Sequence, residues 1–243
     1  MVTKAEERVD PRGRPLRTLF KRIESRLLLI LLAAAAAFSA FFELASDVAE
    51  GDTTDIDRQI LLSFRNPADL SDPLGPRTLE EALRDITALG GFTVLTIVTV
   101  VATLAFLFHR RRMHAAVMAG TVILAQFASS FAKVMYDRPR PDLVSHGSYV
   151  YSNSFPSGHS MLSAATYLTL AMLIASLEPT RATKFMAYVL AVAVIVAVGI
   201  SRVYLGVHWP SDVLGGWAFG AAFSLLAWLV LLKLGARPAP PRG

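Results

Sequence analysis

Long apolar stretches separated by shorter polar connections dominate the sequence. A helix that spans a bilayer needs about 20 mostly apolar residues, and six stretches come close to that length. These stretches are Leu27–Leu44, Ile86–Phe108, Ala115–Ala132, Ser160–Leu177, Phe185–Leu205 and Val213–Leu232. None of them alternates like a strand, and Ala, Leu and Gly dominate them, as is typical of packed transmembrane helices. The pattern predicts an all-α integral membrane protein with a bundle of six transmembrane helices.

The longest connection, residues 45–85, has a pattern of its own. It contains the segments "TTDIDRQILLSFRN" and "RTLEEALRDITAL", and the second places Leu79, Leu83 and Ile86 at helical spacing. This spacing predicts two amphipathic helices. Two roles stay open for them: they lie on the membrane surface, or they form a structured linker that covers the bundle.

Composition supports a membrane protein and excludes some chemistry. Of the 243 residues, 53% are hydrophobic and the mean hydropathy is +0.47, which is too apolar for an ordinary soluble domain of this length. The chain has no cysteine, so disulfides, thiolate nucleophiles and thiolate metal sites are excluded. A net charge of +5 in such a protein reports topology more often than nucleic-acid binding, and no nucleic-acid partner is predicted.

The distribution of Lys and Arg predicts the orientation. Eight lie in residues 1–26, three in "HRRRMH", two in "LEPTRATK" and three from Lys233 onward, which together make two thirds of all 24. In a six-span chain these four regions share one side of the membrane. Because basic residues favour the cytoplasmic side, both termini are predicted to be cytoplasmic. The other connections then face the periplasm or exterior of a bacterial inner (plasma) membrane.

The predicted organisation has three parts. Residues 1–26 form a basic cytoplasmic tail, and the apolar run after them is interpreted as a retained signal anchor rather than a cleaved signal peptide. Residues 27–235 form the membrane domain. The Pro-rich end, residues 236–243, is predicted to be disordered.

Basic side chains gather on the predicted outer side. "AKVMYDRPRPD" supplies Lys133, Arg138 and Arg140, and "SRVYLGVHWPSD" supplies Arg202. Two guanidinium groups and an ammonium favour a dianion, and Arg matches phosphate bidentately. Arg138 is set apart as a supporting or solvated charge. His146, in the same connection, is expected to be a solvated loop residue.

The stretch "FPSGHS" adds a second element of a phosphate pocket. Ser157 is a predicted N-cap for the helix that follows, and Gly158 allows the backbone to approach a ligand. The free N–H groups of that first turn form an anion site at the positive end of the helix dipole.

Two histidines, His159 and His208, would flank a bound phosphate. One neutral imidazole can attack phosphorus, and the other, protonated, can donate to the leaving oxygen. Asp212 lies four residues after His208, where a carboxylate could accept the Nδ1 proton and fix the tautomer. His159 has no acidic neighbour in the sequence and lies at a helix N-terminus, which suits a proton donor.

These residues resemble the type 2 phosphatidic acid phosphatase superfamily, integral-membrane lipid phosphate phosphatases related to vanadium haloperoxidases. The family is marked by Lys-x6-Arg-Pro, Pro-Ser-Gly-His and Ser-Arg-x5-His-x3-Asp. All three occur intact and in order, over Lys133–Pro141, Pro156–His159 and Ser201–Asp212. The resemblance covers residues 115–232, about half of the chain.

The resemblance implies specific roles. His208 is the expected nucleophile, forming a phosphohistidine and oriented by Asp212, while His159 protonates the leaving alkoxide. The residues implied to bind the phosphoryl oxygens are Lys133, Arg140, Ser157, Gly158 and Arg202. The implied mechanism needs no metal or cofactor, and vanadate is expected to inhibit.

The predicted function is hydrolysis of the phosphate or diphosphate of a lipid at the outer leaflet. Undecaprenyl diphosphate, phosphatidylglycerol phosphate and phosphatidic acid fit equally, because the pocket recognises a phosphoryl group and leaves the tail to the membrane. One alternative is a lipid phosphotransferase. A weaker alternative is an anion transporter. A transport pathway should be lined by more polar residues, and Gln126 is the one strongly polar residue at mid-depth of the spans. The sequence does not specify an oligomeric state.

Overall fold

A computed structural model describes residues 16–144 and 152–235 of the chain. The predicted disordered tail 236–243, residues 1–15 of the predicted basic tail and His146 lie outside the described residues. The described part is nearly all helical, as predicted. Its elements are α1 Leu16–Glu50, α2 Thr54–Leu62, β1 Arg65–Asn66, β2 Asp69–Pro73, α3 Arg77–Ala88, α4 Phe92–Phe108, α5 Arg112–Tyr136, α6 Gly158–Leu177, α7 Arg181–Tyr204 and α8 Pro210–Gly235.

Five of these helices are long and apolar enough to cross a membrane, namely α1 from Ser25 onward, α5, α6, α7 and α8. A sixth span arises if α3 and α4 are counted together, because they are bent by 46° at a short break. The structure therefore gives five or six candidate spans in the described residues. The six-span count and the orientation of the termini remain predictions.

The break between α3 and α4 differs from the single apolar run expected over Ile86–Phe108. It falls at Gly90 and Gly91, where Gly91 adopts an extended conformation as the N-cap of α4. Two consecutive glycines lower helix propensity and are a recognised cause of kinks. Packing also explains why glycine stands at this break: a Cβ on Gly90 would lie 2.5 Å from Cγ1 of Val198 on α7.

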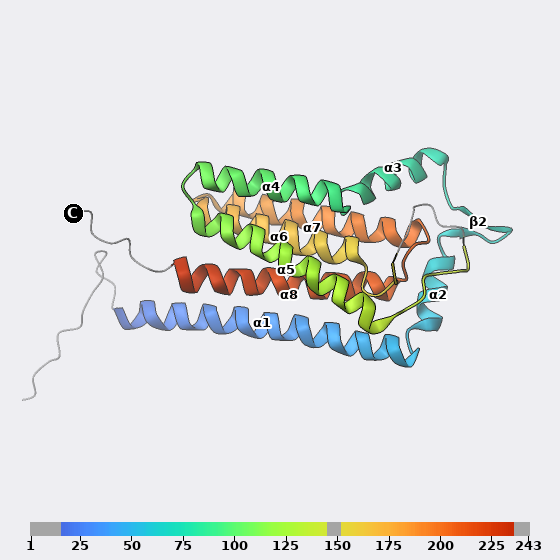
Figure 1. The fold of residues 1–243 in the computed structure, drawn as a ribbon, viewed down its shortest axis with the longest axis horizontal. Coiled ribbons are helices and arrows are strands. Elements are labelled where there is room, and N and C mark those ends of the chain that lie inside the picture. The colour runs from blue at the N-terminus through green and yellow to red at the C-terminus, as the bar shows by residue number, and fades with distance from the viewer. Residues whose placement is uncertain (1–15, 145–151, 236–243) are drawn as a thin grey trace, which may run out of the picture.

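The connection that follows α1 contains both predicted amphipathic helices, α2 and α3. Between them lies an antiparallel pair, β1 and β2, which the sequence pattern did not predict because its mostly exposed residues do not alternate. Figure 1 shows α2, β2 and α3 at one end of the bundle, where α5 and α7 end and α6 and α8 begin. Leu61 of α2 is fully buried, so this layer packs on the bundle and supports the interpretation as a cover.

Helix α6 lies in the middle of the bundle and packs against α4, α5, α7 and α8. More than half of its residues are buried, and most of these are Ala, Ser and Thr, which allow close approach of neighbouring helices. On α8, a Cβ on Gly216 would lie 2.8 Å from the Ser157 carbonyl oxygen, and one on Gly220 would lie 2.3 Å from that of Met161. These glycines therefore bring α8 against the start of α6.

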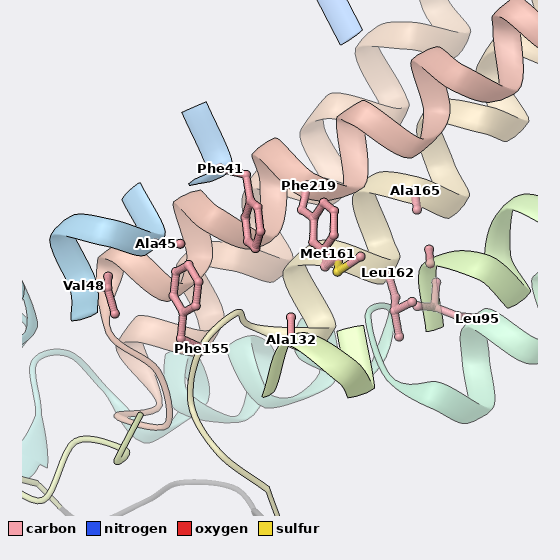
Figure 2. Packing of buried hydrophobic residues seen from close by; sticks show 11 residues of the cluster. Phe41, Ala45, Val48, Leu95, Ala132, Phe155, Met161, Leu162, Ala165 and Phe219 are labelled. Atoms are coloured by element: carbon pink, nitrogen blue, oxygen red, sulfur yellow. The ribbon is translucent and has the colours of Figure 1, made fainter. Parts of the chain in front are cut away.

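An aromatic cluster anchors the chain just before α6. Phe41 of α1 stacks on Phe219 of α8, with ring centroids 4.1 Å apart, and on Phe155, with centroids 5.7 Å apart. Figure 2 shows these three rings among the buried side chains between α1, α8 and the start of α6. Because Phe155 is fully buried, the segment of Pro156 and Ser157 is held in a fixed position relative to α8.

Candidate active site

A cavity of about 580 Å³ opens at the end of the bundle where α6 and α8 begin. Five of the eight predicted site residues line it: Lys133, Arg140, Gly158, His159 and His208. The other three, Ser157, Arg202 and Asp212, are buried behind its wall. The structure therefore brings the residues of all three sequence motifs to one place, from four different helix ends and loops.

The local structure at the start of α8 explains how Asp212 meets His208. Pro210 occupies the first turn of α8, a position where its missing N–H costs nothing. Oδ2 of Asp212 reaches back and accepts the backbone N–H of Trp209 at 2.9 Å, as the third residue of a capping box does. The same oxygen lies 3.2 Å from Nδ1 of His208.

The tautomer of His208 follows from its two neighbours. Nδ1 faces the Asp212 carboxylate, which can only accept, so Nδ1 carries the proton. Nε2 lies 3.1 Å from Nη1 of Arg140, which can only donate. The lone pair on Nε2 therefore faces the guanidinium group of Arg140, at the cavity that both residues line.

Arg140 is held in place by backbone carbonyls. Its Nη1 donates to the Val207 carbonyl at 2.6 Å, and its Nε donates to the Ser152 carbonyl at 2.7 Å. Lys133 is tied to the same segment, since its Nζ donates to the Asn153 carbonyl at 2.5 Å. Arg140 thus approaches the cavity from the connection between α5 and α6, and Lys133 approaches it from the last turn of α5.

The end of α7 sets the path of the loop that carries His208. Gly206 has a φ of 70°, the left-handed conformation typical of the residue after a helix. The N–H groups of Gly206 and Val207 bond back to the carbonyls of Val203 and Arg202, which is the Schellman pattern. This arrangement ends α7 sharply, and the chain then brings His208 to the cavity.

Ser157 is the N-cap of α6, as predicted, and its Oγ accepts the N–H of Ser160. That Oγ also accepts from the Ser160 hydroxyl at 3.0 Å, so it is engaged within the helix turn. The N–H of Ser157 donates to the Asp212 carbonyl at 2.9 Å. Gly158 does line the cavity, and a Cβ there would lie 3.6 Å from Cε of Lys133.

His159 is half-buried in the first turn of α6 and lines the same cavity as His208. The break between α3 and α4 packs against it: a Cβ on Gly91 would lie 3.7 Å from Nε2 of His159. This backbone therefore forms the wall next to the second histidine, a contact that the sequence did not indicate.

Arg202 lies in the last turn of α7 and is almost fully buried. Its Nη1 donates to Oγ1 of Thr87 on α3 at 3.0 Å. Its Nε finds no hydrogen-bond partner among the described residues. A buried guanidinium with a free donor costs free energy unless an anion or another acceptor meets it, so this residue suits an anion-binding site.

Arg138 supports the site and is not a solvated charge. Its side chain is 11% exposed and bridges two carboxylates, with Nη1 2.6 Å from Oδ1 of Asp212 and Nη2 2.8 Å from Oδ2 of Asp57. Its guanidinium also lies 5.7 Å from the centre of the Trp209 ring, within the range of a cation–π contact. Arg138 lies between the signature positions of its motif, so the sequence did not place it among the core site residues.

Ser154 was missed as well. Its hydroxyl donates to Oδ2 of Asp212 and lies 3.3 Å from Nδ1 of His208. Asp57 was missed although a signal existed: on a helical projection it falls on the same face as Leu61, and an acid on the apolar face of an amphipathic helix marks a buried partner.

Burial lowers the pKa of His208 well below its ordinary value, and the positive charges of Arg202, Arg140 and Lys133 lower that pKa further. The neutral imidazole is therefore the favoured form, which a nucleophile requires. Burial also lowers the pKa of Arg140.

Within residues 16–144 and 152–235, no group of three or more His, Asp and Glu side chains is arranged to hold a metal ion.

The chain is similar to known proteins in sequence and in fold. Residues 114–236 match the family model of the PAP2 superfamily. The chain is 37% identical over 146 residues to phosphatidylglycerophosphatase B of Bacillus subtilis (strain 168), covering 58% of this chain and 70% of that protein. It is 34% identical over 124 residues to lipid A 1-phosphatase of Rhizobium johnstonii, covering 47% of each chain.

The fold is also similar to a solved structure, the first transmembrane PAP2 type phosphatidylglycerolphosphate phosphatase from Bacillus subtilis. The two chains superpose with a TM-score of 0.70 at 30% sequence identity, and the match covers 80% of this chain and 94% of the other. The structural likeness therefore extends beyond residues 114–236 into the first half of the chain.

Proposed function

The chain belongs to the PAP2 superfamily, and on that premise we propose that it is a phosphatase that removes phosphate from a membrane lipid through a phosphohistidine on His208. The observation that carries the proposal is the arrangement of His208 between Asp212 and Arg140. Asp212 holds the Nδ1 proton, while Arg140 stands beside the Nε2 lone pair at the cavity. A phosphoryl group bound by Arg140 would lie within reach of that nitrogen.

The first step is attack of Nε2 of His208 on phosphorus. The P–O bond to the lipid breaks, and protonated His159 gives its proton to the leaving alkoxide. Lys133, Arg140 and Arg202 stabilise the charge on the phosphoryl oxygens in the transition state. The imidazolium formed at His208 is stabilised by the carboxylate of Asp212, as in a hydrolase triad.

The second step returns the enzyme to its starting state. Neutral His159 takes a proton from water, whose oxygen attacks the phosphohistidine and breaks the P–N bond. Inorganic phosphate leaves, and His159 is protonated again for the next cycle. The two histidines thus exchange roles as base and acid across the cycle, and no metal ion takes part in either step.

A second cavity supports a lipid rather than a water-soluble phosphate ester. This apolar groove, of about 500 Å³, lies between α4 and α5. It shares Phe92, Gln126 and Leu162 with the cavity of His208, and its other lining residues include Leu95 and Val100. A substrate with its phosphate at His208 would lay its hydrocarbon chain along this groove, where apolar burial favours it.

The proposed substrates are lipid phosphates or diphosphates at the outer leaflet. The relatives' names, phosphatidylglycerophosphatase B and lipid A 1-phosphatase, support lipid phosphates as the class. Lipid A was not among the substrates that the sequence suggested. The outer leaflet is proposed from the distribution of basic residues, which assigns the site end of the bundle to the exterior.

The test is phosphate release by the purified protein in detergent with EDTA present. The panel contains phosphatidylglycerol phosphate, phosphatidic acid, undecaprenyl diphosphate and lipid A, each with wild type and with His208→Ala. The proposal predicts release from at least one lipid by wild type and none above background by the variant. Undiminished release by His208→Ala contradicts the assigned nucleophile, and a requirement for added Mg²⁺ contradicts the metal-free mechanism.

A further inference from the structure

We propose that Asp57 and Arg65, from the connection between α1 and α3, are positioning residues that hold the two ends of the loop carrying His208. This loop, Leu205–Trp209, joins α7 to α8. The inference rests on the proposed function of His208. Both residues lie outside residues 114–236, the part of the chain that matches the family model, so that match assigns them no role.

At the end of α7, Arg65 satisfies a carbonyl that the helix leaves open. The Schellman pattern uses the carbonyls of Arg202 and Val203, and the carbonyl of Tyr204 is the next one along. Nη2 of Arg65 donates to it at 2.8 Å. A cation at this position also interacts favourably with the negative end of the helix dipole. The Tyr204 hydroxyl in turn donates to the Leu74 carbonyl at 2.9 Å, which ties the same turn to the strand pair.

At the start of α8, Asp57 accepts hydrogen bonds from Ser211, in the first turn of the helix. Its Oδ1 accepts the backbone N–H of Ser211 at 2.8 Å, and its Oδ2 accepts the Ser211 hydroxyl at 2.5 Å. The first N–H groups of a helix have no partner within it, and an anion is favoured at this positive end. Asp57 also forms an ion pair with Nη2 of Arg138. Nη1 of Arg138 forms an ion pair with Oδ1 of Asp212. The restraint therefore passes directly to the carboxylate that orients His208.

The choice of residues indicates a role beyond covering the bundle. Asp57 is 1% exposed and Arg65 is 3% exposed, and charged side chains are almost never buried to this extent unless they are paired. An apolar layer would cover the bundle without that cost. Here each charge has the sign that its own helix end prefers, anion at the start of α8 and cation at the end of α7.

The expected consequence is a loss of turnover rather than of binding. The loop spans only Leu205–Trp209, so a shift at either end moves His208 relative to the phosphoryl group. A misplacement of about 1 Å at a reacting atom can cost roughly 100-fold in rate. Lys133, whose ammonium is held by the Asn153 carbonyl, does not depend on either positioning residue. Arg140 does contact the loop, through the Val207 carbonyl, so substrate binding should weaken less than turnover.

The experiment measures kcat and KM in detergent for the full chain, with the panel lipid that wild type hydrolyses fastest. The variants are Asp57→Asn and Arg65→Met, and the matched controls are Asp55→Asn and Arg58→Met, which change exposed residues on α2. We expect kcat to fall at least ten-fold in both variants, with KM within two-fold of wild type. Asp57→Glu and Arg65→Lys should recover part of the lost kcat, and the controls should retain wild-type values.

Several results would overturn the inference. These are an unchanged kcat in both variants, an effect on KM alone, or an equal loss in the controls. If Asp57→Asn does not fold, Thr53→Val replaces it as the variant at the start of α8. This substitution removes only the 3.2 Å hydrogen bond from Arg138 to Oγ1 of Thr53. We expect that variant to lose two- to five-fold in kcat, and an unchanged kcat contradicts the inference.

Failure of the inference differs from failure of the proposed function. If the function is wrong, wild type releases no phosphate, or His208→Ala releases as much as wild type. If the inference alone is wrong, release depends on His208 while Asp57→Asn and Arg65→Met turn over at the wild-type rate.

Discussion

Oδ2 of Asp212 lies 3.2 Å from Nδ1 of His208, and both side chains are buried. The pair is local in sequence, because the capping geometry of α8 turns the carboxylate back toward the preceding loop. The opposite ring nitrogen faces Arg140. One imidazole is thereby fixed in tautomer and in direction.

Asp212→Asn should lower kcat by roughly 10²- to 10⁴-fold with little change in KM, by analogy with the carboxylate of a serine protease triad. An amide in place of the carboxylate can donate to Nδ1 and so favour the wrong tautomer of His208. It also removes the charge that Arg138 holds. Steady-state kinetics on a lipid of the panel measure the effect, and a kcat within two-fold of wild type would refute the assigned role of Asp212.

The pH dependence of kcat/KM tests the electrostatics of the loop. Because burial and nearby cations lower the pKa of His208, the nucleophile stays neutral below the ordinary imidazole value of about 6.5. The acid limb of the profile, which reports the essential base of the free enzyme, should therefore lie below about pH 6.5. A limb due to His208 at or above that value contradicts the environment described for it.

The same lowered pKa has a consequence for stability. Below about pH 6.5 the unfolded chain binds a proton at His208 that the folded chain does not. The free energy of unfolding should therefore fall as the pH decreases through this range. Thermal unfolding of wild type and His208→Gln, compared at about pH 7.5 and about pH 5.5, should show a smaller loss in the variant. An equal loss in both would exclude a contribution from His208.

Gly206→Ala should destabilise the protein by about 1–2 kcal/mol, the cost of a left-handed conformation in a residue with a Cβ, since φ is 70° there. It should also lower kcat, because relaxation of this turn displaces His208. Gly120→Ala is the control: nothing lies within 4 Å of a Cβ at that helical position, so no loss of stability is expected. Unfolding in detergent measures both variants, and equal stability of Gly206→Ala and wild type contradicts the prediction.

Val100→Trp tests the apolar groove. Val100 lines it between α4 and α5, so a bulky side chain should raise KM for the panel lipid while sparing hydrolysis of a small soluble ester such as p-nitrophenyl phosphate. Val101→Trp places the same side chain at a neighbouring exposed residue that is not among those lining the groove. If both variants affect lipid hydrolysis equally, the groove does not hold the hydrocarbon chain.

Much of the site could be predicted from the sequence because its chemistry is concentrated at helix ends. The length of the apolar stretches located the spanning helices, and the residues at the ends of these helices then had to meet at one side of the bundle. The N-cap of Ser157 and the pairing of His208 with Asp212 are local relationships, within three and four positions along the chain. Such relationships follow from helix geometry alone.

The supporting residues could not be found in the same way. Asp57 meets Ser211 across 154 positions, and Arg65 meets Tyr204 across 139, so no local pattern connects them. The bend between α3 and α4 was also missed, because the apolar run continues through Gly90 and the close approach of Val198 is a tertiary contact. The sequence did not show where the connection after α1 lies relative to the bundle, and the roles of Asp57 and Arg65 depend on that position.

The most direct measurement is a rapid-quench experiment with a ³²P-labelled lipid of the panel. We expect a label on the wild-type protein that is stable to alkali and labile to acid, as a phosphohistidine is. Peptide mapping should locate it on the peptide that contains His208, and His208→Ala should carry none. Label on another residue, or full turnover with no labelled enzyme at any quench time, would contradict the account.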